Sequence, residues 1–140
     1  MSEHFQSQNQ IEAVVAGFES CSTSGDAFTH REHLTVAAWY LRDGNEEQAL
    51  VRMREGLLRF LTHHGEGLQK YNETITLFWL KLVRQFVAEL DPQLSFTQVA
   101  NAVVDRFDDS RLIFEHYDRA RLKTREAKSG WTEPDLKPLL

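Results

Sequence analysis

The sequence predicts an all-α protein: a single compact bundle of about six helices around a buried central helix near residues 72–90, with an extended C-terminal strap. Three observations favour this class. Apolar residues recur at helical spacing along the chain, and no segment shows the alternation typical of a strand. Several helix starts carry a capping-box pattern. Of the three prolines, two lie near the C-terminus, at Pro134 and Pro138. We expect the 140 residues to form one domain.

The first half of the chain predicts three helices. Apolar residues at one helical face indicate the first helix over about residues 9–20, after a flexible segment over residues 1–8. A capping-box pattern at residues 29–32 starts a second helix, which ends at the Asp-Gly pair of residues 43–44. A further capping box at residues 45–48 starts a third helix, which runs to about residue 63 and ends before Gly65.

The second half begins with the most hydrophobic segment, over about residues 72–90. Its apolar residues cover nearly the whole circumference of a helix, which is typical of a helix buried at the centre of a domain. Ser95 and Gln98 form another capping box and start a helix that runs to about residue 107. We expect a sixth helix over about residues 111–123 and a short turn over residues 124–128. The tail over residues 130–140 should pack on the body as an extended strap.

Composition and charge narrow the class of protein. The apolar fraction is 41% and the charged fraction 26%, which is ordinary for a soluble domain. Acidic residues outnumber basic ones 21 to 16, which argues against binding to the phosphates of nucleic acid. No apolar run approaches the ~20 residues that span a membrane, and residues 1–10 carry no hydrophobic signal core. The single cysteine, Cys21, suits a reducing compartment. We expect a cytoplasmic protein without nucleic-acid or membrane partners, and the oligomeric state stays open.

His30 and His33 are the first candidates for a functional site. They lie three residues apart, so on a helix they project from one face about a turn apart. Two such imidazoles can share a divalent transition metal such as zinc. The positive end of the helix dipole also favours the neutral form, which binds metals or accepts a proton. In the alternative, structural interpretation, His30 is solvated in the first turn and His33 is hydrogen-bonded in the core.

A second polar cluster occupies residues 71–76, at the start of the most hydrophobic helix. Capping explains part of it, but polar groups at the buried end of a helix are costly unless they pair or bind something. Two compatible interpretations follow: a hydrogen-bond network that joins two helix starts, and a ligand-binding or active site. In the second interpretation, Glu73 and His33 are the candidate catalytic groups. The predicted ligand contacts are Tyr71, Asn72, Thr76 and His30, and the predicted metal ligands are His30, His33 and Glu73.

The other histidines of the helices have structural explanations. His116 lies on the inward stripe of its helix, and we interpret it as a core histidine. His63 and His64 lie in the C-terminal turn of the third helix, where a positive charge suits the helix dipole. We assign none of them a function, although folding could bring one of them to the metal site as a further ligand.

Four motifs together resemble a widespread family of short, uncharacterised bacterial proteins. The motifs are Phe28-x-His30-x-x-His33-Leu34, Tyr71-x-Glu73-Thr74-Ile75-Thr76, His116-Tyr117 and Pro134-Asp135-Leu136-x-Pro138-Leu139. The resemblance spans roughly residues 28–140 and implies a compact helical domain, without implying an activity. Members of that family often carry histidine where this chain has Asn72. Because asparagine is a poor ligand for transition metals, this departure weakens the metal hypothesis.

The sequence therefore predicts a protein that binds a small molecule. Its pocket should lie where the starts of the helices near His30 and Asn72 meet. The sequence leaves open whether a reaction occurs there. The alternative is a non-enzymatic protein-interaction module in which the His, Glu and Tyr cluster is a structural hydrogen-bond network.

Overall fold

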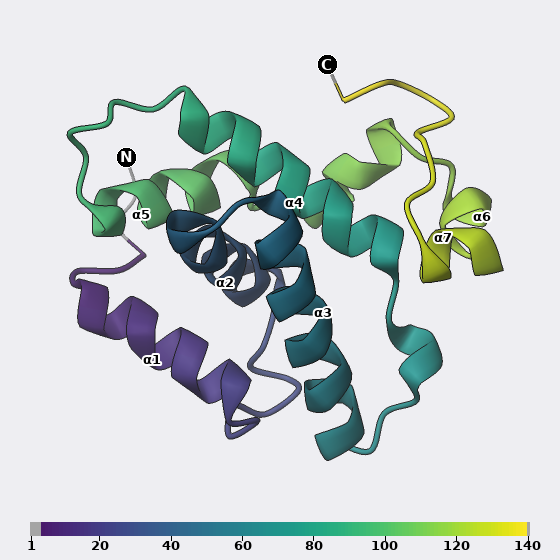
Figure 1. Cartoon of the computed structure of the whole chain (residues 1–140), viewed down its shortest axis with the longest axis horizontal. Coiled ribbons are helices and arrows are strands. Elements are labelled where there is room, and N and C mark those ends of the chain that lie inside the picture. The colour runs from purple at the N-terminus through teal and green to yellow at the C-terminus, as the bar shows by residue number, and fades with distance from the viewer. Residues whose placement is uncertain (1–3, 140) are drawn as a thin grey trace.

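The computed structural model describes residues 4–139, and every element of regular secondary structure in that range is a helix (Figure 1). The all-α class is therefore confirmed. There are seven α-helices and two 3-10 helices in the described range. Their bounds are α1 (Gln8–Glu19), α2 (His30–Asp43), α3 (Glu46–His63), η1 (Leu68–Lys70), α4 (Glu73–Ala88), α5 (Phe96–Phe107), η2 (Ser110–Glu115), α6 (Arg119–Leu122) and α7 (Arg125–Ser129). No helix in residues 4–139 combines the length and the apolar character needed to cross a membrane.

The predicted capping boxes start α2, α3 and α5. In each one, the N-cap side chain and the residue three positions later satisfy backbone N–H groups reciprocally. After the end of α3, Gly65 adopts a φ of +74°, a left-handed conformation that glycine adopts without steric cost. These local signals are strong because the first amides of a helix need partners whatever the rest of the fold does.

The centre of the bundle differs from the expectation. Helix α2 packs against α1, α3, α4 and α5, whereas α4 packs against α2, α3, α5 and α7 (Figure 1). The central position is therefore shared, and α4 is not enclosed on every side. Its outer face carries Lys81 and Arg84, and both side chains pair with Glu46 at the start of α3.

Two apolar clusters meet at α2. One joins α1, α2 and α3 through aromatic rings, with Phe18 stacked on Phe28 at 4.6 Å and Phe60 beside both. The other joins α2, α4 and α5 around Leu34, Val83 and Phe107, among other residues. Because α2 contributes to both clusters, two of its faces are buried, and its first turn contacts α4 and α5 through His30.

The chain after α5 is more broken than the sequence predicts. Instead of one helix over residues 111–123, the structure has η2 and α6, separated at residues 116–118. Asp118 explains the break, because its side chain accepts a hydrogen bond from the amide of Ala120 and so starts a new helix. Thr124 similarly caps α7, where we expected only a turn. Short polar caps placed close together therefore divide this segment.

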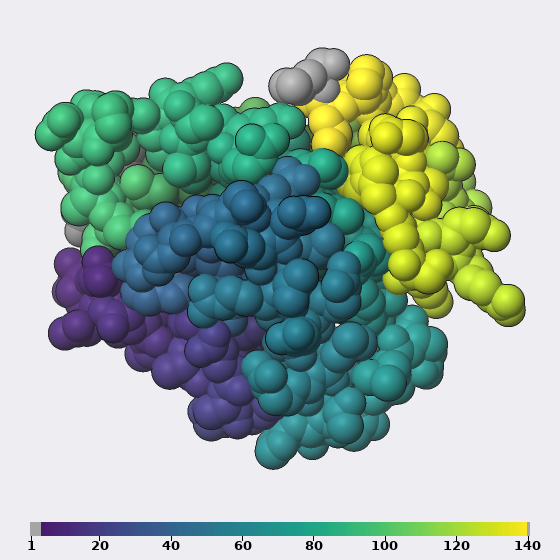
Figure 2. All heavy atoms as spheres, viewed as in Figure 1, coloured from purple at the N-terminus to yellow at the C-terminus, as the bar shows by residue number. Residues whose placement is uncertain are grey.

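The C-terminal strap is confirmed, and it lies against the body next to α4 (Figure 2). The Thr74 hydroxyl of α4 donates to the carbonyl of Gly130 at 2.7 Å and accepts from the amide of Thr132 at 3.1 Å. Further along, the His116 ring bonds to the carbonyl of Lys137 at 2.9 Å. His116 is thus a buried structural residue that attaches the strap.

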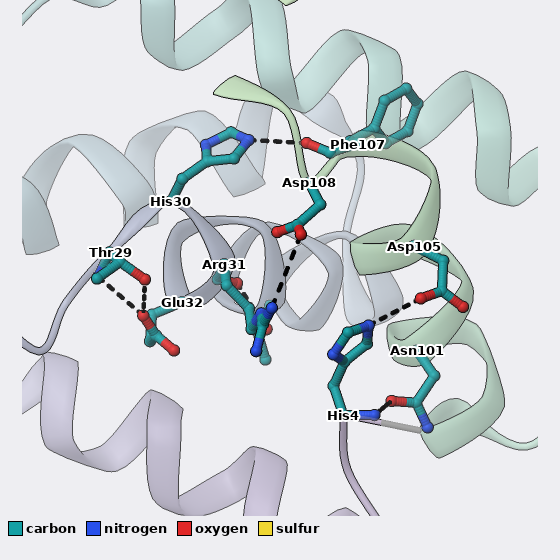
Figure 3. A network of polar contacts seen from close by, with 10 residues as sticks. His4, Thr29, His30, Arg31, Glu32, Asn101, Asp105, Phe107 and Asp108 are labelled. Atoms are coloured by element: carbon teal, nitrogen blue, oxygen red, sulfur yellow. Dashed lines mark hydrogen bonds and ion pairs between the residues drawn. The ribbon is translucent and has the colours of Figure 1, made fainter. Parts of the chain in front are cut away.

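At the other end of the chain, residues 4 and 5 pack on α5. The amide group of His4 donates to the Asn101 side chain (Figure 3). Phe5 is buried, and its amide group donates to the same side chain. The His4 ring also contacts Asp105 at 2.8 Å. This differs from the flexible segment expected over residues 1–8. Residues 1–3 of that segment lie outside the described range.

Replacing Gly56 by alanine should destabilise the fold. A Cβ at this position of α3 would lie 2.5 Å from the Phe18 ring, which is stacked on Phe28 and has little room to move. We expect Gly56→Ala to lower the free energy of unfolding by about 1–2 kcal/mol, because overpacking outweighs the gain in helix propensity.

The control is Gly17→Ala in α1, where the atom crowded by the new Cβ is the rotatable Thr23 hydroxyl and the other neighbours lie at ordinary contact distance. That variant should be as stable as the wild type or more stable. Urea denaturation measures both changes, and equal stability of the two variants would contradict the assignment of Gly56 as a packing position.

Candidate functional site

His30 connects the start of α2 to the end of α5. Its Nε2 donates to the carbonyl oxygen of Phe107 at 2.8 Å (Figure 3). That oxygen belongs to the last turn of α5, where helix carbonyls lack partners within the helix. The imidazole also packs edge-on against Trp79 of α4, with ring centroids 4.5 Å apart. His30 therefore makes a structural contact between three helices.

Buried Glu73 forms an ion pair with the partly exposed Arg54 at the start of α4. Arg54 of α3 donates from both Nε and Nη2 to the two carboxylate oxygens, with the Nε contact at 3.0 Å. The Tyr71 hydroxyl donates to the same carboxylate at 2.5 Å. Burial on its own would raise the pKa of Glu73, but these hydrogen bonds and the Arg54 charge hold the pKa below its ordinary value. Glu73 is thus an ionised carboxylate with both oxygens occupied.

Asn72 and Thr74 tie other segments to the same turn. The Asn72 side chain caps α4 by accepting from the Ile75 amide at 3.0 Å, and its Nδ2 donates to the carbonyl of Leu122 in α6 at 2.7 Å. Thr74 binds the strap, as described above. Much of the polar cluster over residues 71–76 is therefore a network that joins α3, α4, α6 and the C-terminal strap.

A cavity of about 440 Å³ lies between α2, α3 and α4, and we call it the α2–α3–α4 cavity. Its wall is mostly apolar and includes several aromatic rings. The exposed residues of its lining, Gly25, Asp26, Glu66 and Lys70, come from the segments before α2 and after α3, so these segments frame its opening. The other lining residues are Phe28, His33, Ala37, Met53, Leu57, Phe60, Leu61, His64, Tyr71, Asn72, Ile75, Thr76, Trp79 and Leu80.

His33 borders this cavity without a protein partner. The ring lies against Phe28, with centroids 4.5 Å apart. Neither ring nitrogen forms a hydrogen bond with another described residue, and both nitrogens remain accessible from the cavity. Burial among protein atoms, together with the nearby His30, lowers the pKa of His33 to about 4. The imidazole is therefore neutral at pH 7, with one nitrogen that donates and one that accepts.

His64 is the lining residue that the sequence did not single out. Its ring lies against Phe60 at 4.3 Å between centroids, and its Nε2 is buried without a hydrogen-bond partner among the described residues. A signal was present in the sequence, because His64 continues the face of α3 that carries Leu57, Phe60 and Leu61.

The structure separates the predicted site residues into two groups. His33, Tyr71, Asn72 and Thr76 line one cavity, whereas His30 and Glu73 make structural contacts and are not among the residues that line it. No group of three His, Cys, Asp or Glu side chains in residues 4–139 is placed to hold a metal ion. The shared site of His30, His33 and Glu73 is therefore not assembled.

Comparison of the chain with protein-family models, with curated proteins and with solved structures finds no match.

Protonation of His33 should destabilise the folded protein. Because the pKa is about 4 in the folded state and 6.5 ordinarily, the unfolded chain takes up this proton first as the pH falls. The stability that comes from keeping His33 neutral in the folded state is fully present above about pH 6.5. It is lost progressively toward pH 4, and the loss amounts to up to about 3 kcal/mol. Urea denaturation between pH 7.5 and 4.5 should show a steeper loss for the wild type than for His33→Gln. Parallel curves for the two proteins would contradict the burial of a neutral imidazole.

Removing the partner of Glu73 should also destabilise the protein. Arg54→Met leaves a buried carboxylate without its cation, and we expect a loss of about 2 kcal/mol at pH 7. The double variant Arg54→Met/Glu73→Gln should recover at least half of this loss, because the buried charge is gone. Arg59→Met, at an exposed position of the same helix, is the control and should change stability little. A loss for Arg54→Met no larger than that for Arg59→Met would show that the ion pair contributes nothing.

Proposed function

We propose that the protein binds a small, largely apolar molecule in the α2–α3–α4 cavity. The cavity volume of about 440 Å³ lies within the range of known ligand sites. Its wall also has the composition of such sites, with many apolar and aromatic side chains and a few polar ones. The polar opening and apolar interior suit a ligand that enters from solvent and buries most of its surface.

One observation carries this proposal: two imidazoles at the wall of a mainly apolar cavity lack protein partners, His33 with both ring nitrogens and His64 with its buried Nε2. A polar group in such surroundings costs free energy unless it is hydrogen-bonded. The contacts of Glu73 and His30 account for those residues as structure, but they leave His33 unexplained. A bound molecule with a hydrogen-bonding group would supply the missing partner.

Blocking the cavity should abolish binding. Leu57→Trp places an indole ring in the cavity wall, whereas Leu50→Trp introduces the same ring two turns earlier on α3, outside the cavity lining. A library of small aromatic and aliphatic molecules can be screened by ligand-observed NMR. We expect some of its members to bind the wild type and Leu50→Trp with similar affinity, and to bind Leu57→Trp at least tenfold more weakly.

Leu61→Trp, one turn further along α3, provides a second blocking variant if Leu57→Trp does not unfold cooperatively. If no library member binds the wild type, or if neither blocking substitution changes the affinity of the members that bind, the α2–α3–α4 cavity is not a ligand site.

A further inference from the structure

The hydroxyl groups of the cavity wall have already used their protons inside the protein. The Tyr71 hydroxyl donates to Glu73 at 2.5 Å, and the Thr76 hydroxyl donates to the carbonyl of Asn72 at 3.0 Å. A hydroxyl group has one proton and two lone pairs. Toward a molecule in the cavity, both oxygens can therefore act only as hydrogen-bond acceptors.

The direction of the Tyr71 hydrogen bond is fixed by charge. Glu73 is ionised and held by Arg54, and a carboxylate has no proton to give. Burial and the hydrogen bond to Glu73 also raise the pKa of Tyr71 above its ordinary value. The phenol stays protonated, and its proton stays on the side of Glu73. The Arg54–Glu73 pair thus determines the polarity of a cavity that neither residue lines.

The cavity wall carries donors as well as acceptors. Neutral His33 offers one donor and one acceptor, and the Trp79 indole N–H is a further donor of the lining. The hydroxyls of Tyr71 and Thr76 differ from these groups because they can only accept. A molecule that bonds to either hydroxyl must therefore bring a hydrogen-bond donor of its own.

The charges of the lining disfavour anions. Asp26 and Glu66 carry carboxylates, and the one Lys or Arg side chain among the described lining residues is Lys70. Lys70 is already paired with Glu66 at the opening. Deeper in the cavity, a carboxylate would meet a neutral His33 and apolar groups, and burying an unpaired charge there is costly.

The apolar part of the wall suits flat rings. Phe28 and Phe60 lie on one side with centroids 5.1 Å apart, and Trp79 contributes from α4. Aromatic rings gain from stacked and edge-to-face contacts in addition to the area that they bury.

We propose that the ligand is a neutral aromatic molecule with an O–H or N–H donor, of the phenol or indole class. The donor engages the acceptor set of His33, Tyr71 and Thr76, while the ring covers the aromatic wall. This inference rests on the proposed function, because it names the chemical class that the same cavity selects.

Matched probes isolate the donor. Indole and 1-methylindole have nearly the same shape, but only indole carries an N–H group, and benzoate tests an anion. Dissociation constants measured by NMR titration at pH 7.5 should rank indole about tenfold tighter than 1-methylindole, with benzoate weaker than both. Phenol and anisole provide an independent pair for the O–H donor, and phenol should bind more tightly.

A pair of threonine variants locates the acceptor. Thr76→Val removes the cavity oxygen with little change of shape, and it should reduce the preference for indole over 1-methylindole about threefold. Thr35→Val is the control, because buried Thr35 makes the same kind of hydrogen bond, to the carbonyl of Arg31 at 2.9 Å, outside the cavity lining. That variant should keep the full preference.

The outcomes separate this inference from the proposed function. Equal binding of indole and 1-methylindole, or tighter binding of benzoate, would overturn the donor requirement while leaving the cavity as a ligand site. Failure of every aromatic donor to bind would overturn the inference as well. In that case the wider library and the blocking variants at Leu57 and Leu61 decide whether the cavity binds any molecule.

Discussion

The buried carboxylate of Glu73 is the constraint on which the arrangement around the cavity depends. It lies in the first turn of α4, where Arg54 attaches it to α3 and Tyr71 donates to it. A buried charge of this kind is tolerated only when it is fully paired. The pairing therefore fixes the start of α4 against α3, and with it the separation of the two helices that enclose the cavity. The neighbouring residues Asn72 and Thr74 extend the same junction to α6 and the strap.

Local sequence signals predict the first part of the fold well, because they describe interactions that close within four residues. The capping boxes at Thr29, Asn45 and Ser95 start helices wherever the rest of the chain lies. The segment after α5 is harder to predict, since its pattern of apolar residues continues through a cap. Asp118 caps a new helix there through the amide of Ala120, and its own amide donates to Asp135 of the strap at 3.0 Å, a long-range contact that the local pattern does not reveal.

The candidate site could be located from sequence only in part. The cluster over residues 71–76 and the pair of histidines correctly indicate that α2 and α4 meet, and His33 and Tyr71 do line one cavity. What the spacing cannot reveal is where each side chain finds its partner. His30 and His33 share one side of α2, yet His30 bonds to the Phe107 carbonyl at the end of α5, and His33 borders the cavity. The remaining lining depends on α3, whose packing against α4 is a tertiary property.

The proton arrangement explains why a ligand could compete with the water that would otherwise fill the cavity. Water supplies donors to Tyr71 and Thr76 as well as any organic group does, so a hydrogen bond alone gives a ligand little advantage. Water does not, however, bury the apolar surface of Phe28, Phe60 and Trp79, as a bound ring would. A ring without a donor covers that wall but leaves the acceptors unpaired, which costs free energy. A ring that carries a donor both buries the apolar wall and pairs with the acceptors, and the proposed selectivity of the cavity rests on that combination.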